Sequence, residues 1–285
     1  MYFASRMVEW EQAEHLQADK IEEELKALID DQNVAAITQT MPSRFQKTYL
    51  GLMVQERWAK LDREAAVNWL SNQEKPTHFQ IAAAVRDWTV KNDERMYRYI
   101  ASLIPGDWKN GLLAGLGQDA LNNGDPEQAY LLLCNLPPGD EQTRLLSAAV
   151  VQWSQWDPKG ALEQIGKMSD IAVQEKIIPS VAIGYAINEP RAAADWLIQS
   201  LEPGMILDQG LAAVIQIWAN QHDATEAAVW LAQIPEGKCR SCALQALLTI
   251  WRDNSPQSAK AWVESLPDGS LRAEAVNEFE KLAKP

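Results

Sequence analysis

Two cysteines stand three residues apart in the stretch KCRSCA, and their spacing is that of dithiol redox centres. Cys239 and Cys242 fall at the start of a predicted helix, where the helix dipole lowers the pKa of a thiol. No βαβ pattern accompanies the pair, although that context is typical of such motifs. The spacing therefore leaves three interpretations open: a redox pair, a local disulfide in an oxidising compartment, or two packed thiols.

A second set of residues with possible chemistry is a series of acids at regular intervals. Carboxylate pairs that cleave glycosidic bonds stand about 5 to 9.5 Å apart, whereas residues on successive packed helices are about 10 Å apart. Helical-hairpin toroids do host such enzymes, so a hydrolase or lyase with carboxylates in a central cavity is one alternative. Helix capping explains the same acids. The acids are Asp31, Asp62, Asp93, Asp125, Asp157, Glu189 and Asp223.

Other catalytic motifs are missing from the sequence. It contains no G-x-S-x-G, no H-E-x-x-H and no phosphate-binding glycine loop, which are the usual marks of hydrolases, zinc proteases and nucleotide-binding enzymes. Its three histidines are widely separated and form no metal-ligand cluster. The sequence predicts no catalytic residue, no metal and no cofactor.

These acids lie within a sequence motif that recurs along the chain. EPRAAADWLIQSLEPG from Glu189 returns as DATEAAVWLAQIPEG from Asp223 and SPQSAKAWVESLPDG from Ser255. We call the acid or serine that opens each copy the cap position. Successive cap positions from Asp31 to Ser255 are 31 to 34 residues apart. Such a steady period is typical of stacked repeat arrays.

Each copy predicts two helices. The cap residue can accept hydrogen bonds from the first turn, proline often follows it, and the spacing of Asp223 and Glu226 is that of a capping box. The first helix ends near L-P-x-G, and a second apolar helix follows. Alanine four residues after most cap positions permits close helix packing. Nine of the twelve tryptophans recur in phase, so we expect them in the core.

This pattern resembles the helical-hairpin α-solenoids, such as the tetratricopeptide, Sel1-like and HEAT proteins, over roughly residues 30 to 283. It differs in period and lacks the W-x2-L-G-x2-Y string of tetratricopeptides, and is more similar to Trp-rich repeats of bacterial proteins. The resemblance implies an all-α fold, a right-handed α-α superhelix of about eight hairpins, and a binding role. It carries over no functional residue.

We expect residues 1–30 to form an N-terminal capping helix and residues 31–285 to form one repeat domain. The apolar opening MYFASRMVEW is compatible with a position just after a removed anchor or signal segment, which would place the repeats in a periplasm-like space. The opening is also compatible with an ordinary amphipathic capping helix. Of the two compartments, the bacterial periplasm is slightly favoured over the cytoplasm.

The charge of the chain excludes some partners. The formal net charge is -13 and there is no basic stripe, so nucleic acid and anionic membranes are unsuitable ligands. No apolar run approaches the length of about 18 residues that spans a bilayer, so we expect no membrane insertion. With nucleic acid and membranes excluded, we expect the partner to be a protein or a peptide.

Residues that break the repeat are the candidates for contacting this partner. Trp156 and Trp108 stand where most copies have polar loop residues, and tryptophan dominates interface hot spots; each can instead fold back onto its own hairpin. The third copy replaces alanine with an aromatic and adds cations, which can grip an acidic or aromatic side chain or simply fill a wider helix spacing. These residues are Arg95, Tyr97, Arg98 and Tyr99.

The sequence favours a non-catalytic scaffold that presents a concave helical face to a protein or peptide. The toroid hydrolase or lyase and the dithiol redox protein are the alternatives. Cys134, in LLLCNLPP, is expected to be a core residue.

Overall fold

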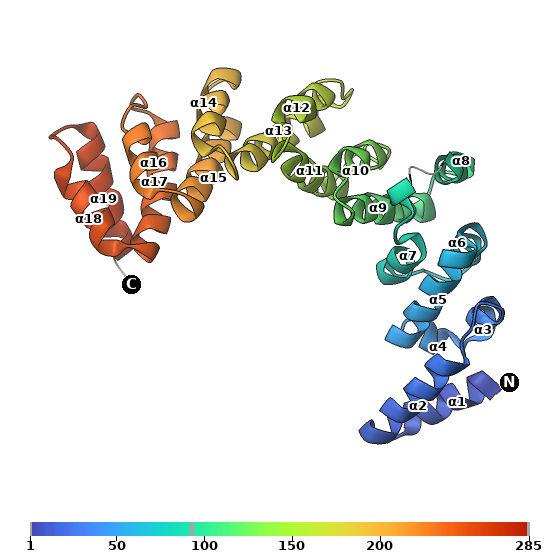
Figure 1. The fold of residues 1–285 in the computed structure, drawn as a ribbon. Coiled ribbons are helices and arrows are strands. Elements are labelled where there is room, and N and C mark those ends of the chain that lie inside the picture. Colours follow the sequence, from blue (N-terminus) through green and yellow to red (C-terminus); the bar gives the residue numbers. More distant parts are fainter. Residues whose placement is uncertain (1, 92–93, 284–285) are drawn as a thin grey trace. The chain divides into compact units, whose positions relative to one another are not determined.

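The computed structural model describes residues 2–91 and 94–283. These residues form α-helices and one short 3-10 helix, and the described ranges contain no strand. By their internal contacts they divide into two compact units, Met1–Pro137 and Pro138–Pro285, which we call unit 1 and unit 2. The all-α fold predicted from the repeat is confirmed, and neighbouring helices stack against one another (Figure 1).

Unit 1 opens with a helical hairpin and continues with longer and shorter helices in alternation. Its helices are α1 (Tyr2–Gln12), α2 (His15–Leu28), α3 (Val34–Thr40), α4 (Ser43–Gln46), α5 (Tyr49–Leu61), α6 (Arg63–Ser71), α7 (His78–Val85), η1 (Thr89–Lys91), α8 (Glu94–Ser102), α9 (Asp107–Asn122) and α10 (Pro126–Leu133). Within this unit α5 packs on α7 and α7 packs on α9.

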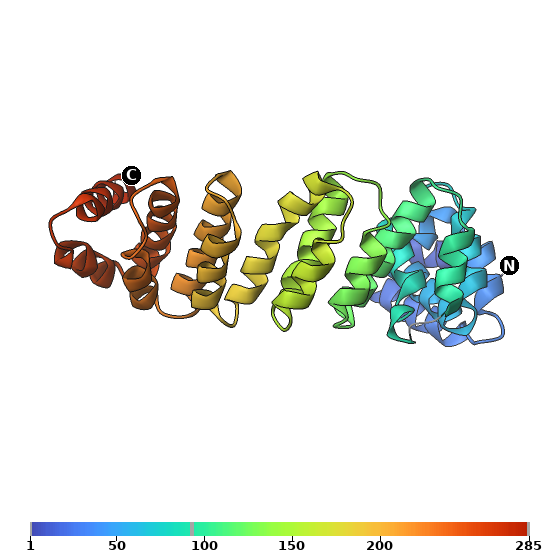
Figure 2. The ribbon, with the colours of Figure 1, turned by 90° about the horizontal axis from the view of Figure 1, so that it is seen from above.

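Unit 2 is a two-layer stack. Its helices are α11 (Asp140–Ser154), α12 (Pro158–Ile165), α13 (Ile171–Ala186), α14 (Pro190–Ser200), α15 (Met205–Gln221), α16 (Ala224–Leu231), α17 (Lys238–Asn254), α18 (Pro256–Ser265) and α19 (Ser270–Ala283). The long helices α11, α13, α15 and α17 pack against one another in sequence, and the short helices α12, α14 and α16 lie over them (Figures 1 and 2).

Most of the short helices begin where the sequence predicts, because an aspartate caps them. The side chains of Asp62, Asp125, Asp157 and Asp223 each accept a hydrogen bond from a backbone N–H of the first helical turn, at 2.7 to 3.1 Å. Such a bond satisfies a donor that has no partner within the helix. The cap prediction is confirmed at these four positions.

The other cap positions differ. Asp31 does not cap a helix, because α3 begins three residues later, at Val34, and the Asp31 carboxylate instead pairs with Arg57 at 2.9 Å. Glu189 and Ser255 stand at the N-cap of α14 and α18 without a side-chain bond. Asp93 lies outside the described residues.

The predicted capping box at Asp223 is not formed. The Asp223 side chain bonds the N–H of Thr225, two residues on, so it does not reach the third residue as a capping box requires. A reciprocal box does form at the start of α7, where Thr77 accepts from the Gln80 N–H and the Gln80 side chain accepts from the Thr77 N–H. The sequence analysis missed this one.

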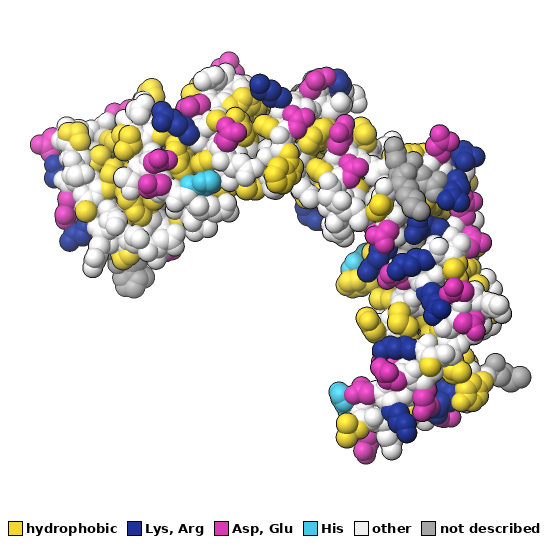
Figure 3. Space-filling view, in the orientation of Figure 1, with side chains coloured by type: hydrophobic (Ala, Val, Ile, Leu, Met, Phe, Trp, Pro, Cys, Tyr) yellow, Lys and Arg dark blue, Asp and Glu magenta, His cyan; other side chains and the backbone are white. Residues whose placement is uncertain are grey.

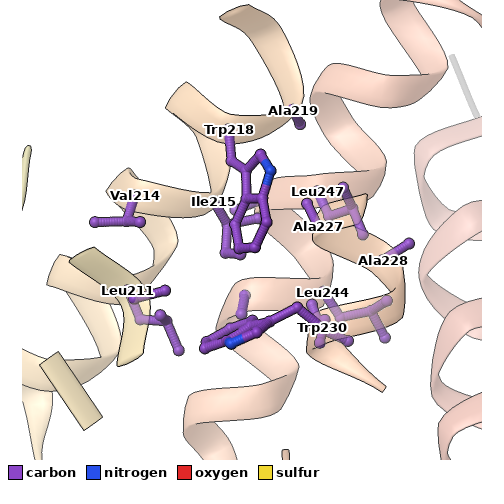
Figure 4. Packing of buried hydrophobic residues seen from close by; sticks show 14 of the residues in the cluster. Leu211, Val214, Ile215, Trp218, Ala219, Ala227, Ala228, Trp230, Leu244 and Leu247 are labelled. Atoms are coloured by element: carbon purple, nitrogen blue, oxygen red, sulfur yellow. The ribbon is translucent and has the colours of Figure 1, made fainter. Parts of the chain in front are cut away.

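Tryptophan pairs pack between the helices of three hairpins. Trp58 and Trp69, Trp218 and Trp230, and Trp251 and Trp262 stand as tilted ring pairs with centroids 5.7 to 5.8 Å apart. Six of the nine in-phase tryptophans are buried and three are partly buried. Figure 4 shows Trp218 and Trp230 among Leu211, Ile215 and Leu247. Such aromatic pairs bring stability beyond the area they bury.

Alanine makes the close contacts between helices. The repeat alanines Ala129, Ala161, Ala193, Ala227 and Ala259 have no exposed surface. A larger side chain at these positions would push neighbouring helices apart, because protein interiors are close-packed. The small residue therefore recurs at most places where a short helix meets a long one.

Side chains just before the cap positions link neighbouring hairpins of unit 2, and we call these bonds the edge bonds. Asn188 Nδ2 donates to the Gln155 carbonyl at 2.7 Å, and His222 Nε2 lies 3.0 Å from the Ile187 carbonyl. Asn254 Nδ2 donates to the Asn220 side chain at 3.3 Å. Each edge bond joins one hairpin to the one before it.

The N-terminal segment forms two helices, where a single capping helix was expected. The helical conformation is interrupted at Ala13 and Glu14, and α1 packs against α2. Arg6 of α1 forms ion pairs with Glu9 and with Glu24 of α2. Among the described residues, no helix combines the length and apolarity needed to cross a bilayer.

Candidate functional site

We call the solvent-facing side of the long helices of unit 2 the long-helix face, and describe it on α15 and α17. On α15 its residues recur every three or four positions, opposite the buried side that carries Leu211, Val214 and Trp218. On α17 they stand opposite Leu244 and Leu247. The residues of the face on these two helices are Gln209, Ala213, Gln216, Asn220, Cys242, Gln245 and Thr249.

The centre of this face carries no charge. Its side chains on α15 and α17 are carboxamides, a hydroxyl, a thiol and a methyl group, although the whole chain has a formal net charge of -13. Figure 3 shows the corresponding edge of the stack as mostly white, while acidic, basic and hydrophobic side chains gather above it, toward the short helices. A carboxamide both donates and accepts hydrogen bonds, so this surface suits a neutral polar ligand.

The short helices leave grooves between them. Between α14 and α16, two adjoining depressions of about 340 and 230 Å³ share Arg191, Trp218 and Glu226. We call them together the Trp218 groove. Trp218 of α15 is almost fully buried beneath it, and Glu189 and Asp195 line the α14 side.

Unit 1 has a groove of the same kind. A depression of about 460 Å³ is lined by Asp62, Arg63 and Glu64 at the start of α6, by Trp88, and by Arg95 of α8. We call it the Trp88 groove. The guanidinium carbon of Arg63 lies 5.7 Å from the Trp88 ring centre, and Arg63 Nη2 donates to the Arg86 carbonyl at 2.9 Å.

The two predicted tryptophan candidates have different environments. Trp156 lies in the turn between α11 and α12 with 77% of its surface exposed, so the structure does not fold it back, and its role as a partner contact stays a prediction. Trp108 is partly buried on α9 and lies beside the Tyr99 hydroxyl. Burial raises the pKa of Tyr99.

The four predicted partner-binding residues on α8 do not form a single binding cluster. The Tyr99 ring packs on Trp88 with centroids 6.0 Å apart, in the place where other hairpins have their second tryptophan. The Tyr97 hydroxyl accepts a hydrogen bond from Gln128 of α10 at 3.0 Å. Arg95 lines the Trp88 groove, and Arg98 is exposed. Helical geometry sends neighbouring side chains in different directions, so two of the four pack within unit 1.

The two cysteines of the pair are partly buried, and no disulfide joins them in the structure. Cys134, Cys239 and Cys242 are all free thiols of intermediate exposure. Burial raises the pKa of Cys239 to about 11, and the nearby charges of Asp208 and Cys242 act in the same direction. The expectation that the helix N-terminus lowers the pKa is wrong for Cys239, because burial outweighs the dipole. A redox role for the pair stays a prediction.

We expect Cys239 to react slowly with alkylating reagents. A thiol with pKa about 11 instead of the usual 9.0 has about 100-fold less thiolate at pH 8. In a Cys134→Ser/Cys242→Ser variant, iodoacetamide should label Cys239 at pH 8 about 100-fold more slowly than it labels a free cysteine whose amino and carboxyl groups are blocked. The labelling rate of Cys239 should rise tenfold per pH unit to about pH 10. A rate that levels off near about pH 8 would instead indicate the low pKa of a redox centre.

No three His, Cys, Asp or Glu side chains gather to hold a metal ion in residues 2–91 and 94–283. Comparison of the chain with protein-family models, with curated proteins and with solved structures gave no match. The candidate sites therefore have to be judged from their own geometry.

The sequence analysis missed the carboxamides of the long-helix face. Gln209 and Gln216 are seven residues apart and Gln245 occupies the next long helix, so the helical spacing of glutamines was available as a signal.

Proposed function

We propose that this chain is a non-catalytic helical-repeat scaffold, an α-solenoid of hairpins repeating about every 32 residues, that binds a protein or peptide on its long-helix face. The observation that carries the proposal is the uncharged row of exposed carboxamides on α15 and α17 of unit 2. The starts of α12, α14, α16 and α18 at residues 158, 190, 224 and 256 support the repeat.

The spacing of the two layers supports a concave binding surface. Long helices α15 and α17 pack directly together, whereas grooves separate the short helices α14 and α16. A two-layer stack bends toward its more closely spaced layer, so the long helices would line the inside of the curve. Curved inner surfaces of this kind are the usual binding sites of helical repeats.

The chemistry of the face suits an extended peptide. Adjacent helix axes lie about 8 to 10 Å apart, and three residues of an extended chain span about 10 Å. A peptide running across α15 and α17 can thus offer a backbone N–H or C=O to each helix. Gln216 and Gln245 can answer either group, because a carboxamide contains both a donor and an acceptor.

Selection of random linear peptides displayed on phage tests the proposal. We expect selected peptides to bind the full chain, and the double variant Gln216→Glu/Gln245→Glu to bind them at least about tenfold more weakly. The substitution keeps the shape of the side chain but removes the N–H₂ donors.

The matched control carries the same change on the short-helix layer. Gln199→Glu/Gln257→Glu alters two exposed residues of α14 and α18 and should leave peptide affinity unchanged. Failure to select any binding peptide, or an equal loss of affinity in both double variants, would contradict a binding site on the long-helix face.

A further inference from the structure

We propose that the exposed side of α5 and α7 in unit 1 binds an extended, acidic segment of a partner protein, in which a large apolar residue stands three positions before a carboxylate. We call this side the α5–α7 surface. Its residues are Tyr49, Met53, Glu56 and Lys60 of α5, and His78, Phe79, Ala82 and Arg86 along and at the end of α7. It belongs to unit 1, so this inference goes beyond the proposed function, which concerns unit 2.

The residues of the α5–α7 surface share one side of each helix. They recur mostly every three or four positions, as a single helix face requires. On α5 they lie opposite the buried Leu50, Val54 and Trp58, and on α7 they lie opposite the buried Ala84. Figure 3 shows hydrophobic and basic side chains together along the edge of unit 1 that these helices form.

The two helices pack together with a register that two contacts define. Arg86 Nε, at the end of α7, lies 3.5 Å from Glu56 Oε2 of α5. Arg63, two residues after the end of α5, donates to the Arg86 carbonyl at 2.9 Å, so the C-terminal ends of α5 and α7 lie together. Tyr49 and Phe79 each stand seven residues before this ion pair, and therefore lie level with each other at the N-terminal ends.

The N-terminal end of the α5–α7 surface is aromatic and open to solvent. Tyr49 is 73% exposed and Phe79 is 62% exposed. Lys26 Nζ lies 5.8 Å from the centre of the Tyr49 ring, and the His78 ring centre lies 4.0 Å from that of Phe79, yet most of both rings stays uncovered. Packed helix axes are about 8 to 10 Å apart, so two level rings can hold one apolar side chain of a partner between them.

The C-terminal end of the α5–α7 surface carries more cations than carboxylates. The exposed Lys60 and Arg86 share the carboxylate of Glu56, whose side chain is only 21% exposed. Within residues 2–91 and 94–283, this is the one carboxylate that either cation contacts. Arg86 uses its Nε for this contact, so its two terminal amino groups can bind a second carboxylate through paired N–H groups.

The local charge is the opposite of that of the whole chain. Three cations and one carboxylate, an excess of two positive charges, belong to α5 and to α7 with its C-cap residue: Arg57, Lys60, Arg86 and Glu56. The whole chain has a formal net charge of -13, but salt screens exposed charges beyond about 8 Å. An acidic group that reaches this end of the surface is therefore attracted.

The distance between the two ends sets the spacing in the partner. Seven residues of a helix span about 10.5 Å, and three residues of an extended chain span about 10 Å. An apolar residue between Tyr49 and Phe79 thus places the third residue after it beside Arg86. The carboxylate of Glu56 lies within the surface, which suits a single acid of a peptide better than the dense negative charge of an anionic membrane.

Nuclear magnetic resonance of the three histidine rings tests the proposal. The probe is the blocked peptide acetyl-Gly-Trp-Ser-Gly-Glu-Gly-amide, added to the full chain labelled with ¹⁵N at its histidines. We expect the ring signals of His78, which lies beside Phe79, to shift, and those of His15 and His222 to stay in place. The same peptide with glutamine in place of glutamate, or with alanine in place of tryptophan, should bind at least about tenfold more weakly.

Matched variants separate the surface from general attraction to the chain. Arg86→Gln should weaken the peptide at least about tenfold, and Arg191→Gln, which makes the same change in net charge on α14, should not. Tyr49→Ser/Phe79→Ser should abolish the shifts of His78. Leu131→Ser/Val229→Ser removes apolar side chains that are 50% and 59% exposed on α10 and α16 and should retain them. Circular dichroism checks that each variant keeps its helices.

Four results would overturn the proposal. They are the absence of His78 shifts up to the solubility limit of the peptide, equal binding by the glutamine or alanine peptide, equal effects of a variant and its control, and sedimentation of the chain with phosphatidylserine vesicles that Tyr49→Ser/Phe79→Ser abolishes. The last result would assign the surface to a membrane. None of them changes the affinity of peptides selected on the long-helix face of unit 2, so the two proposals can fail separately.

Discussion

Replacing Gly184 with alanine is expected to lower the free energy of unfolding by about 3 kcal/mol, although alanine is the better helix former. Gly184 lies on α13 where this helix crosses α11, and a Cβ atom there would stand 2.2 Å from the Val151 carbonyl oxygen and 2.8 Å from the Ser154 Cβ. Because one of these neighbours is backbone, the two helices would have to move apart. Urea denaturation followed by circular dichroism measures the loss.

Gly166 provides the matched control for this substitution. It ends α12 with φ -61°, a conformation that alanine adopts without strain, and its nearest neighbours would be 3.5 Å from the added atom. Gly166→Ala should therefore leave stability unchanged or raise it by up to about 1 kcal/mol. Equal effects of the two substitutions would contradict the close approach of α11 and α13.

Replacing Arg240 with methionine is expected to lower the free energy of unfolding by about 3 kcal/mol, because it leaves the Glu274 carboxylate without its ion-pair partner. Arg240 of α17 is 6% exposed; it forms an ion pair with Glu274 of α19 and donates to the Ser270 hydroxyl at 3.0 Å. Without the guanidinium, the Glu274 side chain, only 27% exposed, would keep its charge beside an apolar residue. The same denaturation experiment measures the effect.

Two further variants give the Arg240 prediction its control. Arg272→Met removes an exposed pair with Asp268 at 2.9 Å, and such surface pairs contribute at most about 1 kcal/mol. Arg240→Met/Glu274→Leu removes both charges of the pair and should recover most of the stability that Arg240→Met loses. If Arg240→Met were as stable as Arg272→Met, the packing of α19 would not depend on the ion pair between Arg240 and Glu274.

The helices and much of the core were predictable because they follow from local rules. Asp125 and Asp157 cap helices as their types suggest, and the proline after each fits the first helical position. Buried Trp58 and Trp218 recur in phase because the same joint is packed each time. Asp31 was mispredicted because its ion pair with Arg57 of a later helix depends on tertiary contact.

The candidate sites were less predictable, since they depend on what neighbouring hairpins leave open. The exposure of Trp156 and the packing of Tyr99 on Trp88 cannot be told from residue type alone. The Trp218 groove is visible only when two hairpins are placed side by side.

The edge bonds of Asn188, His222 and Asn254 have a mechanical consequence for unit 2. Each crosses a single joint, and no one of them spans two. A stretching force along the stack of unit 2 would act on these joints between hairpins in series. Hairpins would then come apart singly, in small steps of extension, instead of in one rupture.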